Sequence, residues 1–533
     1  MTALAPAWAS PHPPATVHNL LLMRSGEQPD RPFLMFEGRS FSHAEVAARS
    51  TAAASALRSL GIGRGDRVAL MLSNRPEFLF LWFGCSMLGA IEVPVHTGQK
   101  GEFLAYVLER ADCRMIVAEA CFWEQLSPVI ERPRSLECAA FLDGLPRHEG
   151  RVRVTAFDSL PQQETVPYAD VGGTAPHAIM FTSGTTGPSK GAVMPQSFPL
   201  VVGEVIARAA EYTSEDVLYN ALPLFHGNAQ FLSTIPALLV GAQVVLARRF
   251  SASQFWSEVR RYGCTEFNYI GGILPMLMKA DPSPQDRDHP LRVMMGAGAP
   301  KEIFRQFEQR FGVRLVEGYG MSEIGIPLMS ERTTPPGSCG RPHAGYEVRL
   351  IDAEGNDVAD NVAGEILVRP RQLGAMMLEY YGMPEQTVEA WRDLWFHTGD
   401  YLKRDTQGHY WFIDRKKDAL RRRGENISSW ELEQVVNTHP DVLETAAIPV
   451  PAELGEDEVM VCVVLRPGRT LEPEALVRFC EERMAKFMVP RYVRRIAALP
   501  KTPTERVQKF ELRQQGVTSD TWDRLAQAGV ATA

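Results

Sequence analysis

Short apolar runs alternate with helical patterns over the first third of the chain. A capping box formed by Ser42 and Glu45 precedes an Ala-rich helical run that ends at Gly61. Strand-like runs follow at Arg67–Leu72, Arg114–Ala118, Ala178–Phe181 and Ala242–Ala247. This alternation predicts an α/β fold with layers of helices over largely buried strands.

The most apolar segment is Phe78–Ile91, FLFLWFGCSMLGAI. It is shorter than the roughly 20 residues that a membrane-spanning helix needs, and Glu92 follows it at once. We therefore expect a buried helix, with Asn74 as its N-cap, and no integral membrane segment. Residues 1–14 have neither a basic flank nor a long apolar core, so they do not resemble a signal peptide.

Beyond about residue 337 the pattern changes to short strands among Gly- and Asp-rich turns, which predicts a β-rich subdomain. A charged stretch, DRKKDALRRR, then begins at Asp414, and the rest reads as a small α+β unit with strands at Thr445–Val450 and Val459–Leu465 and a helix at Glu472–Met484. We predict an N-terminal domain over residues 1–414, a mobile C-terminal domain over residues 415–533, and a hinge near residues 415–418.

Composition narrows the classes of partner. The chain has 533 residues and a net charge of −8, so it has no basic excess with which to bind nucleic acid as its main partner. Its eight cysteines form no CxxC pair and no regular spacing, which argues against a disulfide framework or a zinc site. A cytoplasmic protein acting on small molecules is the expectation.

The clearest candidate for chemistry is the run Phe181–Val193, FTSGTTGPSKGAV, which follows a short apolar strand. Glycines allow backbone amides to approach an oxyanion closely, hydroxyls donate further hydrogen bonds, and Lys190 supplies a positive charge. The run suits a triphosphate, but it is not the P-loop pattern, because Lys190 is followed by Gly191. Taken alone, a string of this kind is more often a polar Gly/Ser/Thr surface loop.

This run resembles the signature of the adenylate-forming superfamily, which includes acyl-CoA synthetases, firefly luciferase and the adenylation domains of peptide synthetases. Four further segments match the family's motifs in the expected order, and they are Glu317–Glu323 (EGYGMSE), Trp395–Asp400 (WFHTGD), Asp414–Glu433 and Leu499–Arg513. The resemblance covers essentially the whole chain. Within the family, GENISSWELE and the stretch Phe479–Tyr492 look most like the crotonobetaine/carnitine-CoA ligase group.

The resemblance implies an ATP site. Its residues are Thr182, Ser183, Gly184, Thr185, Thr186, Lys190, Gly298, Ala299, Pro300, Glu317, Gly318, Tyr319, Gly320, Met321, Ser322, Asp400 and Arg415. Adenine would lie between Gly298–Pro300 and the face of Tyr319, and Asp400 would accept the ribose hydroxyls. By itself an Asp in a TGD turn would be a turn former.

The family reaction implies three further sites. An acyl pocket would involve His226, Gly296 and Gly320, although a buried core histidine explains His226 equally well. Lys417 would be the hinge residue, and Gly424, Glu425 and Asn426 would line the path of coenzyme A (CoA). The neighbouring arginines, residues 421–423, could meet CoA phosphates, but a charge run is more often a solvated face.

The chemistry of adenylation needs no general base, because a carboxylate with a pKa near ~4 is already ionised at pH 7. Catalysis should instead consist of charge neutralisation and alignment. Lys190 and Ser322 can contact phosphate oxygens, and Glu323 is the candidate ligand for Mg²⁺, which typically takes one or two carboxylates plus phosphates. The alternative for Glu323 is a surface carboxylate that caps a helix.

The sequence departs from the family pattern near the C-terminus. Where the family has Gly-Lys, with a catalytic lysine, this chain has Glu505-Arg506. Arginine keeps the charge but not the compact ammonium geometry. Lys509 lies three residues further on and would share a helical face with Arg506 if a helix began there. Our hypothesis is that Arg506 or Lys509 serves the adenylation step.

Three functions therefore remain open. The first is an acyl-CoA synthetase that uses ATP, Mg²⁺ and CoA to activate a small-molecule carboxylic acid. The second is an adenylating ligase with another acceptor, such as a carrier protein or an amine. The third is a nucleotide-binding homologue without catalysis, which the change at Arg506 makes conceivable. The identity of the acid cannot be read from the sequence, and a homodimer is the default for the oligomeric state.

Overall fold

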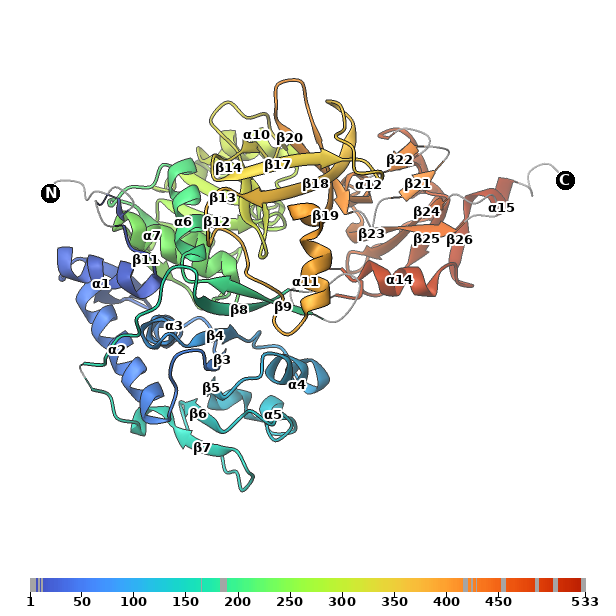
Figure 1. Cartoon of the computed structure of the whole chain (residues 1–533). Coiled ribbons are helices and arrows are strands. Elements are labelled where there is room, and N and C mark those ends of the chain that lie inside the picture. The colour runs from blue at the N-terminus through green and yellow to red at the C-terminus, as the bar shows by residue number, and fades with distance from the viewer. Residues whose placement is uncertain are drawn as a thin grey trace. The chain divides into compact units, whose positions relative to one another are not determined.

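A computed structural model describes residues 6–7, 10, 13–163, 165–182, 189–415, 420–422, 425–427, 429–451, 457–484, 488–501 and 507–528 (Figure 1). The chain forms two compact units. The first comprises Met1–Thr182, Lys190–Val348 and Val368–Phe396, and the second comprises Ser183–Ser189, Arg349–Leu367 and His397–Ala533. The mixed α/β class that the sequence predicts is confirmed. The predicted hinge falls mostly on residues 416–419, outside the described part, and the domain boundary stays a prediction.

The first unit contains a seven-stranded sheet in the order β7-β6-β5-β3-β4-β8-β9. All neighbours are parallel except β8 and β9, which form an antiparallel pair. The strands are β3 (Arg67–Met71), β4 (Ile91–Pro94), β5 (Met115–Glu119), β6 (Cys138–Leu142), β7 (Arg153–Ala156), β8 (Pro176–Thr182) and β9 (Lys190–Pro195). Three of the predicted strands therefore lie in this sheet.

Helices cover both faces of this sheet. They are α2 (His43–Ser59), α3 (Pro76–Leu88), α4 (Gly101–Arg110) and α5 (Trp123–Leu126). Residues of α4 and α5 pack on one face in a single apolar cluster, and Figure 1 draws α2 and α3 on the opposite side. The predicted capping box at Ser42 and Glu45 is confirmed, and α3 is buried along almost its whole length.

The predicted N-cap of α3 is wrong. The helix begins at Pro76, and Arg75 occupies the N-cap position without a side-chain capping bond. The side chain of Asn74 is instead buried and bonded to other loops, with its amide nitrogen 2.9 Å from both Leu222 O and Ala247 O. The Asn74 side chain therefore makes tertiary hydrogen bonds instead of capping the N-terminus of α3, as the local pattern had predicted.

A nine-stranded sheet in the order β16-β15-β14-β13-β12-β10-β11-β1-β2 completes the first unit. Its strands are β1 (Pro32–Phe36), β2 (Arg39–Ser42), β10 (Val217–Asn220), β11 (Gln243–Leu246), β12 (Glu266–Ile270), β13 (Val293–Ala297), β14 (Arg314–Met321), β15 (Gly325–Met329) and β16 (Arg341–Pro342). The run from β1 through β14 is parallel, so the carboxyl ends of its strands meet at one edge. The helices of this region are α1 (Val17–Glu27), α6 (Phe198–Ala209), α7 (Ile235–Val240), α8 (Phe255–Tyr262), α9 (Ile273–Met278), α10 (Lys301–Phe311) and α11 (Pro384–Ala390).

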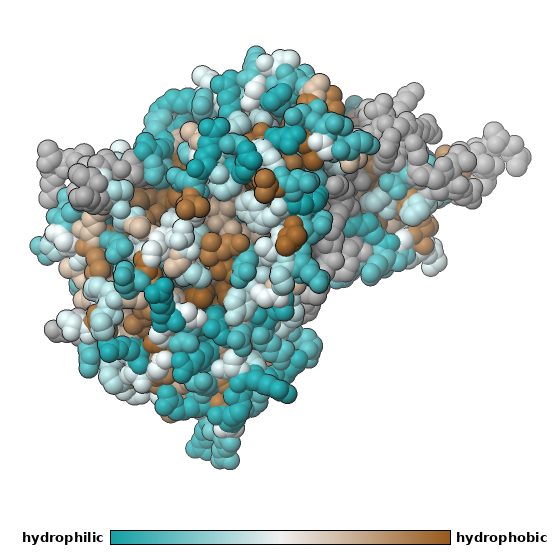
Figure 2. Space-filling view, in the orientation of Figure 1, coloured by the Kyte–Doolittle hydropathy of each residue, from teal (hydrophilic) through white to brown (hydrophobic). Residues whose placement is uncertain are grey.

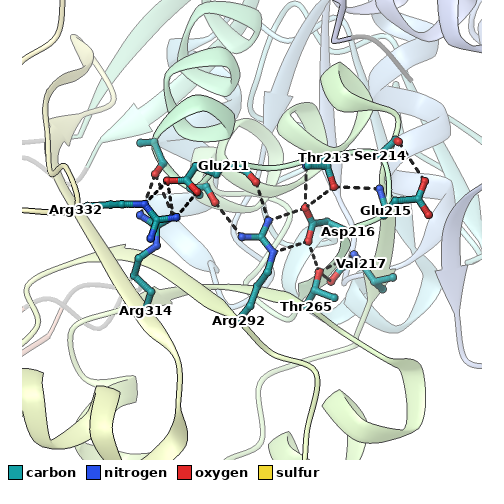
Figure 3. Close-up of polar contacts among 12 residues, drawn as sticks. Glu211, Thr213, Ser214, Glu215, Asp216, Val217, Thr265, Arg292, Arg314 and Arg332 are labelled. Carbon is teal, nitrogen blue, oxygen red and sulfur yellow. Dashed lines mark hydrogen bonds and ion pairs between the residues drawn. The ribbon is translucent and has the colours of Figure 1, made fainter. Parts of the chain in front are cut away.

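A charged network holds the opposite, amino-terminal edge of this sheet (Figure 3). Asp216, just before β10, accepts hydrogen bonds from Arg292, which precedes β13, and from Thr265, which precedes β12, at 2.6 and 2.7 Å. Arg292 also donates to the carbonyl of Glu211 beyond the end of α6, at 2.8 Å. Arg314, the first residue of β14, lies 3.8 Å from the Glu211 carboxylate. These contacts tie the starts of four parallel strands, β10, β12, β13 and β14, to the end of α6.

The second unit has its own sheet and core. The strands β23 (Val442–Pro451), β24 (Asp457–Leu465), β25 (Tyr492–Arg495) and β26 (Thr521–Asp523) form this sheet, and the predicted strands at 445–450 and 459–465 are confirmed. The helices are α12 (Ser429–Asn437), α13 (Pro473–Glu481), α14 (Lys509–Gln515) and α15 (Arg524–Ala528). Smaller sheets contain β17 (Tyr346–Ile351), β18 (Ala363–Pro370), β19 (Phe396–Arg404), β20 (Tyr410–Arg415), β21 (Leu420–Arg422) and β22 (Glu425–Ile427). One apolar cluster packs α12 and α13 against β23 and β24.

The visible surface mixes hydrophilic residues with separate hydrophobic groups (Figure 2). Among the described residues, no helix combines the length and the apolar character that a bilayer crossing requires. The buried position of α3 agrees with the expectation that Phe78–Ile91 is a core helix.

Replacing Asp216 by Ala should destabilise the first unit by on the order of 2–4 kcal/mol, because it leaves Arg292 without its buried partner. Burial alone would raise the pKa of Asp216, but hydrogen bonds from Arg292, Thr265 and the Thr213 backbone outweigh it and lower the pKa. The contribution of the ionised Asp216 should therefore be complete at neutral pH and decline as the pH falls below about 4. Urea unfolding midpoints at pH 7.5 and at acid pH measure both effects.

The matched control is Glu37→Ala, which removes an ion pair with Arg248 in which both side chains are more than half exposed. Such a surface pair contributes at most about 1 kcal/mol. Equal losses for the two variants at pH 7.5 would contradict the role assigned to Asp216.

Candidate functional site

The candidate site lies in loops at the carboxyl edge of the parallel sheet. This is the edge at which open α/β sheets bind ligands, because the loops that follow neighbouring strands converge there. The loop after β10 carries His226, the turn after β13 contains Gly298–Pro300, and the β14–β15 hairpin carries Ser322 and Glu323. Residues predicted from separate motifs therefore follow strands of one sheet.

The antiparallel pair β8–β9 presents the ends of the predicted phosphate loop. Thr182, the last residue of β8, lies opposite Lys190, the first residue of β9. Ser183, Gly184, Thr185 and Thr186 lie outside the described residues, so their roles stay predictions. The Thr182 hydroxyl lies 3.2 Å from Glu323 Oε1 and donates to it. The structure thus joins two motifs that are 141 residues apart in the sequence.

Glu323 is only 3% exposed, and a second hydroxyl reaches the same oxygen. The Tyr380 hydroxyl donates to Glu323 Oε1 at 3.1 Å, and Lys190 Nζ lies 4.7 Å from the centre of the Tyr380 ring. Burial, together with the Glu323 charge, raises the pKa of Tyr380, so its hydroxyl stays protonated. Sequence reasoning missed Tyr380, since no motif that we used includes it.

Glu317 organises the turn after β13. It is buried in β14, and its Oε1 accepts hydrogen bonds from the Ala299 amide at 2.6 Å and from the Tyr269 hydroxyl at 3.3 Å. Burial raises the pKa of Glu317 to about 7. Ala299 is therefore positioned by a carboxyl group that changes its charge near neutral pH.

At Gly296 and Gly320, two glycines of the predicted acyl pocket, the neighbouring backbone leaves no room for a Cβ atom. A Cβ atom on Gly320 would lie 2.1 Å from the Gly325 carbonyl oxygen across the β14–β15 hairpin. A Cβ atom on Gly296 would lie 2.4 Å from the carbonyl oxygen of Tyr269 on β12. Both positions thus need glycine for the packing of the sheet, whether or not they also line a pocket.

The loop that carries His226 is held from two sides by side-chain amides. Asn74 Oδ1 accepts from the Leu224 amide at 2.8 Å, and Gln230 Nε2 donates to the Leu224 carbonyl at 2.8 Å. Gln230 belongs to a π-helix, Asn228–Thr234, a rare element that often marks functional sites. Its second amide hydrogen goes to Oε1 of the fully buried Glu92 at 3.0 Å.

Aromatic rings surround this loop. The ring of Phe225 lies 4.5 Å from that of His96 and 4.8 Å from that of His226, measured between centroids. His226 is half-buried rather than fully enclosed. The structure therefore places His226 at the carboxyl edge of the sheet beside Phe225 and His96, and its acyl-binding role stays a prediction.

Gly318, Tyr319 and Met321 lie in β14 of the first unit, whereas the predicted residues from Asp400 onward belong to the second unit. Asp400 is 9% exposed and pairs in register with Arg415 between β19 and β20. Glu425 and Asn426 form β22, opposite Arg422 and Arg421 of β21. Lys417, Gly424 and Arg506 lie outside the described residues.

Lys509 is engaged inside the second unit. It is the first residue of α14, so the helix begins after residue 506. Its Nζ lies 2.8 Å from Glu433 Oε1 and donates to the hydroxyl of the buried Ser429. Both partners belong to α12.

A scan of protein families agrees with this assembly. The model of the AMP-binding enzyme family matches residues 23–381, and that of the AMP-binding enzyme C-terminal domain matches residues 431–506. The chain belongs to the AMP-binding enzyme family, which confirms the resemblance drawn from the motifs.

Relatives of known function support a finer placement. The crotonobetaine/carnitine-CoA ligase of Proteus mirabilis (strain HI4320) is 33% identical over 493 residues, which cover 89% of this chain and 93% of the relative. The enzyme of the same name from Salmonella typhimurium (strain LT2) is 32% identical over 92% of this chain and 97% of its own length.

Solved structures share the fold over nearly the whole chain. The anthranilate CoA ligase AuaEII, in complex with anthranoyl-AMP, superposes with a TM-score of 0.84 at 24% identity, covering 96% of this chain and 98% of its own. ATP-bound MatB from Rhodopseudomonas palustris gives 0.82 at 24% identity, covering 93% and 98%. At this identity the likeness establishes the fold.

Replacing Glu92 by Gln should stabilise the protein increasingly as the pH rises from 5 to 8. Burial raises the pKa of Glu92 well above its ordinary value, whereas the unfolded side chain ionises near ~4.3. Folding at higher pH must therefore return a proton to Glu92, and stability is lost as the pH increases. A glutamine avoids this cost and still offers an oxygen to Gln230. Thermal unfolding midpoints across the pH range measure the difference.

Glu92→Leu is the control, because it removes the acceptor and leaves the Gln230 amide without that partner. It should be less stable than the wild type throughout the pH range. A Gln-minus-wild-type difference that stays constant with pH would rule out a protonated Glu92.

Proposed function

We propose that the protein is an acyl-CoA synthetase that activates a carboxylic acid in two steps. In the first, a carboxylate oxygen attacks the α-phosphorus of ATP, forming an acyl adenylate and releasing pyrophosphate. In the second, the CoA thiol attacks the acyl carbon, giving acyl-CoA and AMP. The observation that carries the proposal is the meeting of Thr182, Lys190 and Glu323 at the carboxyl edge of the sheet.

The residues at this point suit the first step. Hydroxyl and carboxylate oxygens are the ligands that Mg²⁺ prefers, so Glu323 would hold the ion, which when bound neutralises charge on the phosphates. Lys190 would contribute a further positive charge, and Ser322 would donate to the α-phosphate. The attacking carboxylate is ionised at neutral pH, so this step needs alignment and charge stabilisation rather than a base.

The remaining assignments extend the proposal along the substrates. Adenine would lie between the Gly298–Pro300 turn, which Glu317 holds, and Tyr319, while Asp400 and Arg415 would bind the ribose. Lys417 would be the hinge between the two steps, and Gly424, Glu425 and Asn426 would line the path of CoA. His226 would border the acyl pocket together with Gly296 and Gly320. A homodimer is the proposed assembly.

The acid itself is proposed from the relatives. Two of them are named crotonobetaine/carnitine-CoA ligases, so crotonobetaine and carnitine are the first acids to test. An acceptor other than CoA is the competing proposal. The relatives' names favour CoA, since each of these enzymes is called a CoA ligase.

The proposed reaction predicts acid-dependent exchange of pyrophosphate into ATP, and AMP release that accelerates when CoA is added. A panel that contains crotonobetaine, carnitine, and aliphatic and aromatic acids would be assayed with and without CoA. Glu323→Gln should lower the exchange rate by at least about 100-fold, the order of loss that follows removal of a transition-state charge partner. Exchange without any effect of CoA would favour another acceptor. Exchange with no acid in the panel would count against the proposed function.

A second prediction tests whether Arg506 or Lys509 supplies the positive charge for the adenylation step. Because Lys509 is already paired with Glu433 and Ser429, we assign the adenylation charge to Arg506. Arg506→Ala should lose exchange at least about tenfold but still convert a supplied acyl adenylate to thioester. Lys509→Met should instead lower the unfolding midpoint of the second unit, because it removes the ion pair between Lys509 and Glu433. Full exchange activity in Arg506→Ala would overturn the assignment.

A further inference from the structure

Tyr380 contacts two residues of the candidate ATP site, Glu323 and Lys190, although no motif identified it. Its side chain is 5% exposed, its hydroxyl donates to Glu323 Oε1, and its ring lies beneath Lys190 Nζ. One side chain therefore contacts both the proposed metal ligand and the proposed phosphate-binding cation. An ammonium over an aromatic face within about 6 Å is an attractive arrangement.

The backbone around Tyr380 is fixed on both sides. Residues 377–381 run alongside β9: Leu378 N donates to Val193 O, and Tyr381 N donates to Gly191 O, both at 2.8 Å. At the start of the segment, Met377 N donates to the carbonyl of Glu323 at 2.8 Å. The Tyr380 amide itself donates to Thr387 Oγ1 at 3.0 Å.

These bonds connect the two parts of the site through one segment. The segment is attached to β9, which begins with Lys190, and to the hairpin residue Glu323. These bonds therefore hold the hydroxyl and the ring of Tyr380 in one place relative to β9 and Glu323. Residues whose rotamers are locked by such packing are the ones that pre-organise binding groups.

We infer that Tyr380 is a positioning residue that orients the Glu323 carboxylate for the metal ion and Lys190 for the phosphates. The inference rests on the proposed function. The Thr182 and Tyr380 hydroxyls both donate to Oε1, which would leave Oε2 of Glu323 available to a bound cation. The Tyr380 ring keeps the Lys190 ammonium near the same carboxylate.

The experiment is calorimetric titration of ATP into the full chain with Mg²⁺ and, separately, with EDTA. Tyr380→Phe removes only the hydroxyl and should weaken the binding of Mg·ATP about tenfold, the order expected for one hydrogen bond to a charged group. Binding of ATP without metal should be unchanged. Tyr380→Leu also removes the ring below Lys190 and should weaken both titrations.

Tyr219→Phe is the matched control. Tyr219 is a buried tyrosine of β10 whose hydroxyl donates to the carboxylate of Glu258, so the same substitution removes the same type of bond elsewhere in the first unit. It should leave both affinities unchanged even if the unfolding midpoint falls. Mg·ATP affinity in Tyr380→Phe within twofold of the wild type would overturn the inference, as would wild-type ATP binding that does not depend on Mg²⁺.

Failure of the proposed function has a different signature. Tight, Mg²⁺-dependent ATP binding by the wild type without pyrophosphate exchange for any acid would count against acid activation. The effect of Tyr380→Phe on Mg·ATP affinity would then still decide the role of Tyr380.

Discussion

The parallel pairing of β10, β12, β13 and β14 is the constraint on which the first unit depends. Parallel strands place all their starts at one edge and all their ends at the other. In this protein the starts are cross-linked by Asp216 and Arg292 with their neighbours, and the ends are left to loops that carry polar side chains. The charge network therefore fixes the strands at the amino-terminal edge of the sheet. The loops at the carboxyl edge can then be specialised for binding.

Three buried glutamates near the carboxyl edge, Glu92, Glu317 and Glu323, have different surroundings and therefore different roles. Glu92 is fully enclosed, its pKa is raised by burial, and its Oε1 accepts a hydrogen bond from Gln230. Glu317 accepts from a backbone amide and a tyrosine, and its pKa of about 7 leaves it on the border between two charge states. Glu323 alone receives two side-chain hydroxyls on one oxygen. Of the three, Glu323 has the surroundings of an ion ligand.

Much of the fold could be predicted from local sequence. Short apolar runs bounded by turn residues identified strands such as β3 and β5, and the pair Ser42 and Glu45 identified the start of α2. Local signals failed where a side chain is used by distant backbone. Asn74 has the residue type of a helix cap, but it bonds to Leu222, Leu224 and Ala247, which no local pattern could show.

The same limit applies to the site. The motifs identified Lys190 and Glu323 because the loop chemistry and the family resemblance coincide there. Tyr380 belongs to the site because residues 377–381 run alongside β9. The two segments are almost 190 residues apart, and no periodic pattern in the sequence predicts that they pair. The glycines at 296 and 320 were assigned to a pocket, whereas the close approach of neighbouring backbone already requires them.

The C-terminal change from lysine to arginine can be judged from what surrounds Lys509. Glu433 Oε1 accepts both the Lys509 ammonium and the Ala447 amide, at 2.8 and 2.7 Å, so this carboxylate joins α12, α14 and β23. Withdrawing Lys509 to serve a substrate would leave a half-buried carboxylate without its cation, which is costly. An arginine at position 506 retains the positive charge that adenylation needs. The arrangement therefore makes Lys509 a charge that holds the second unit together, and this is the reason why the adenylation charge is proposed for Arg506 instead.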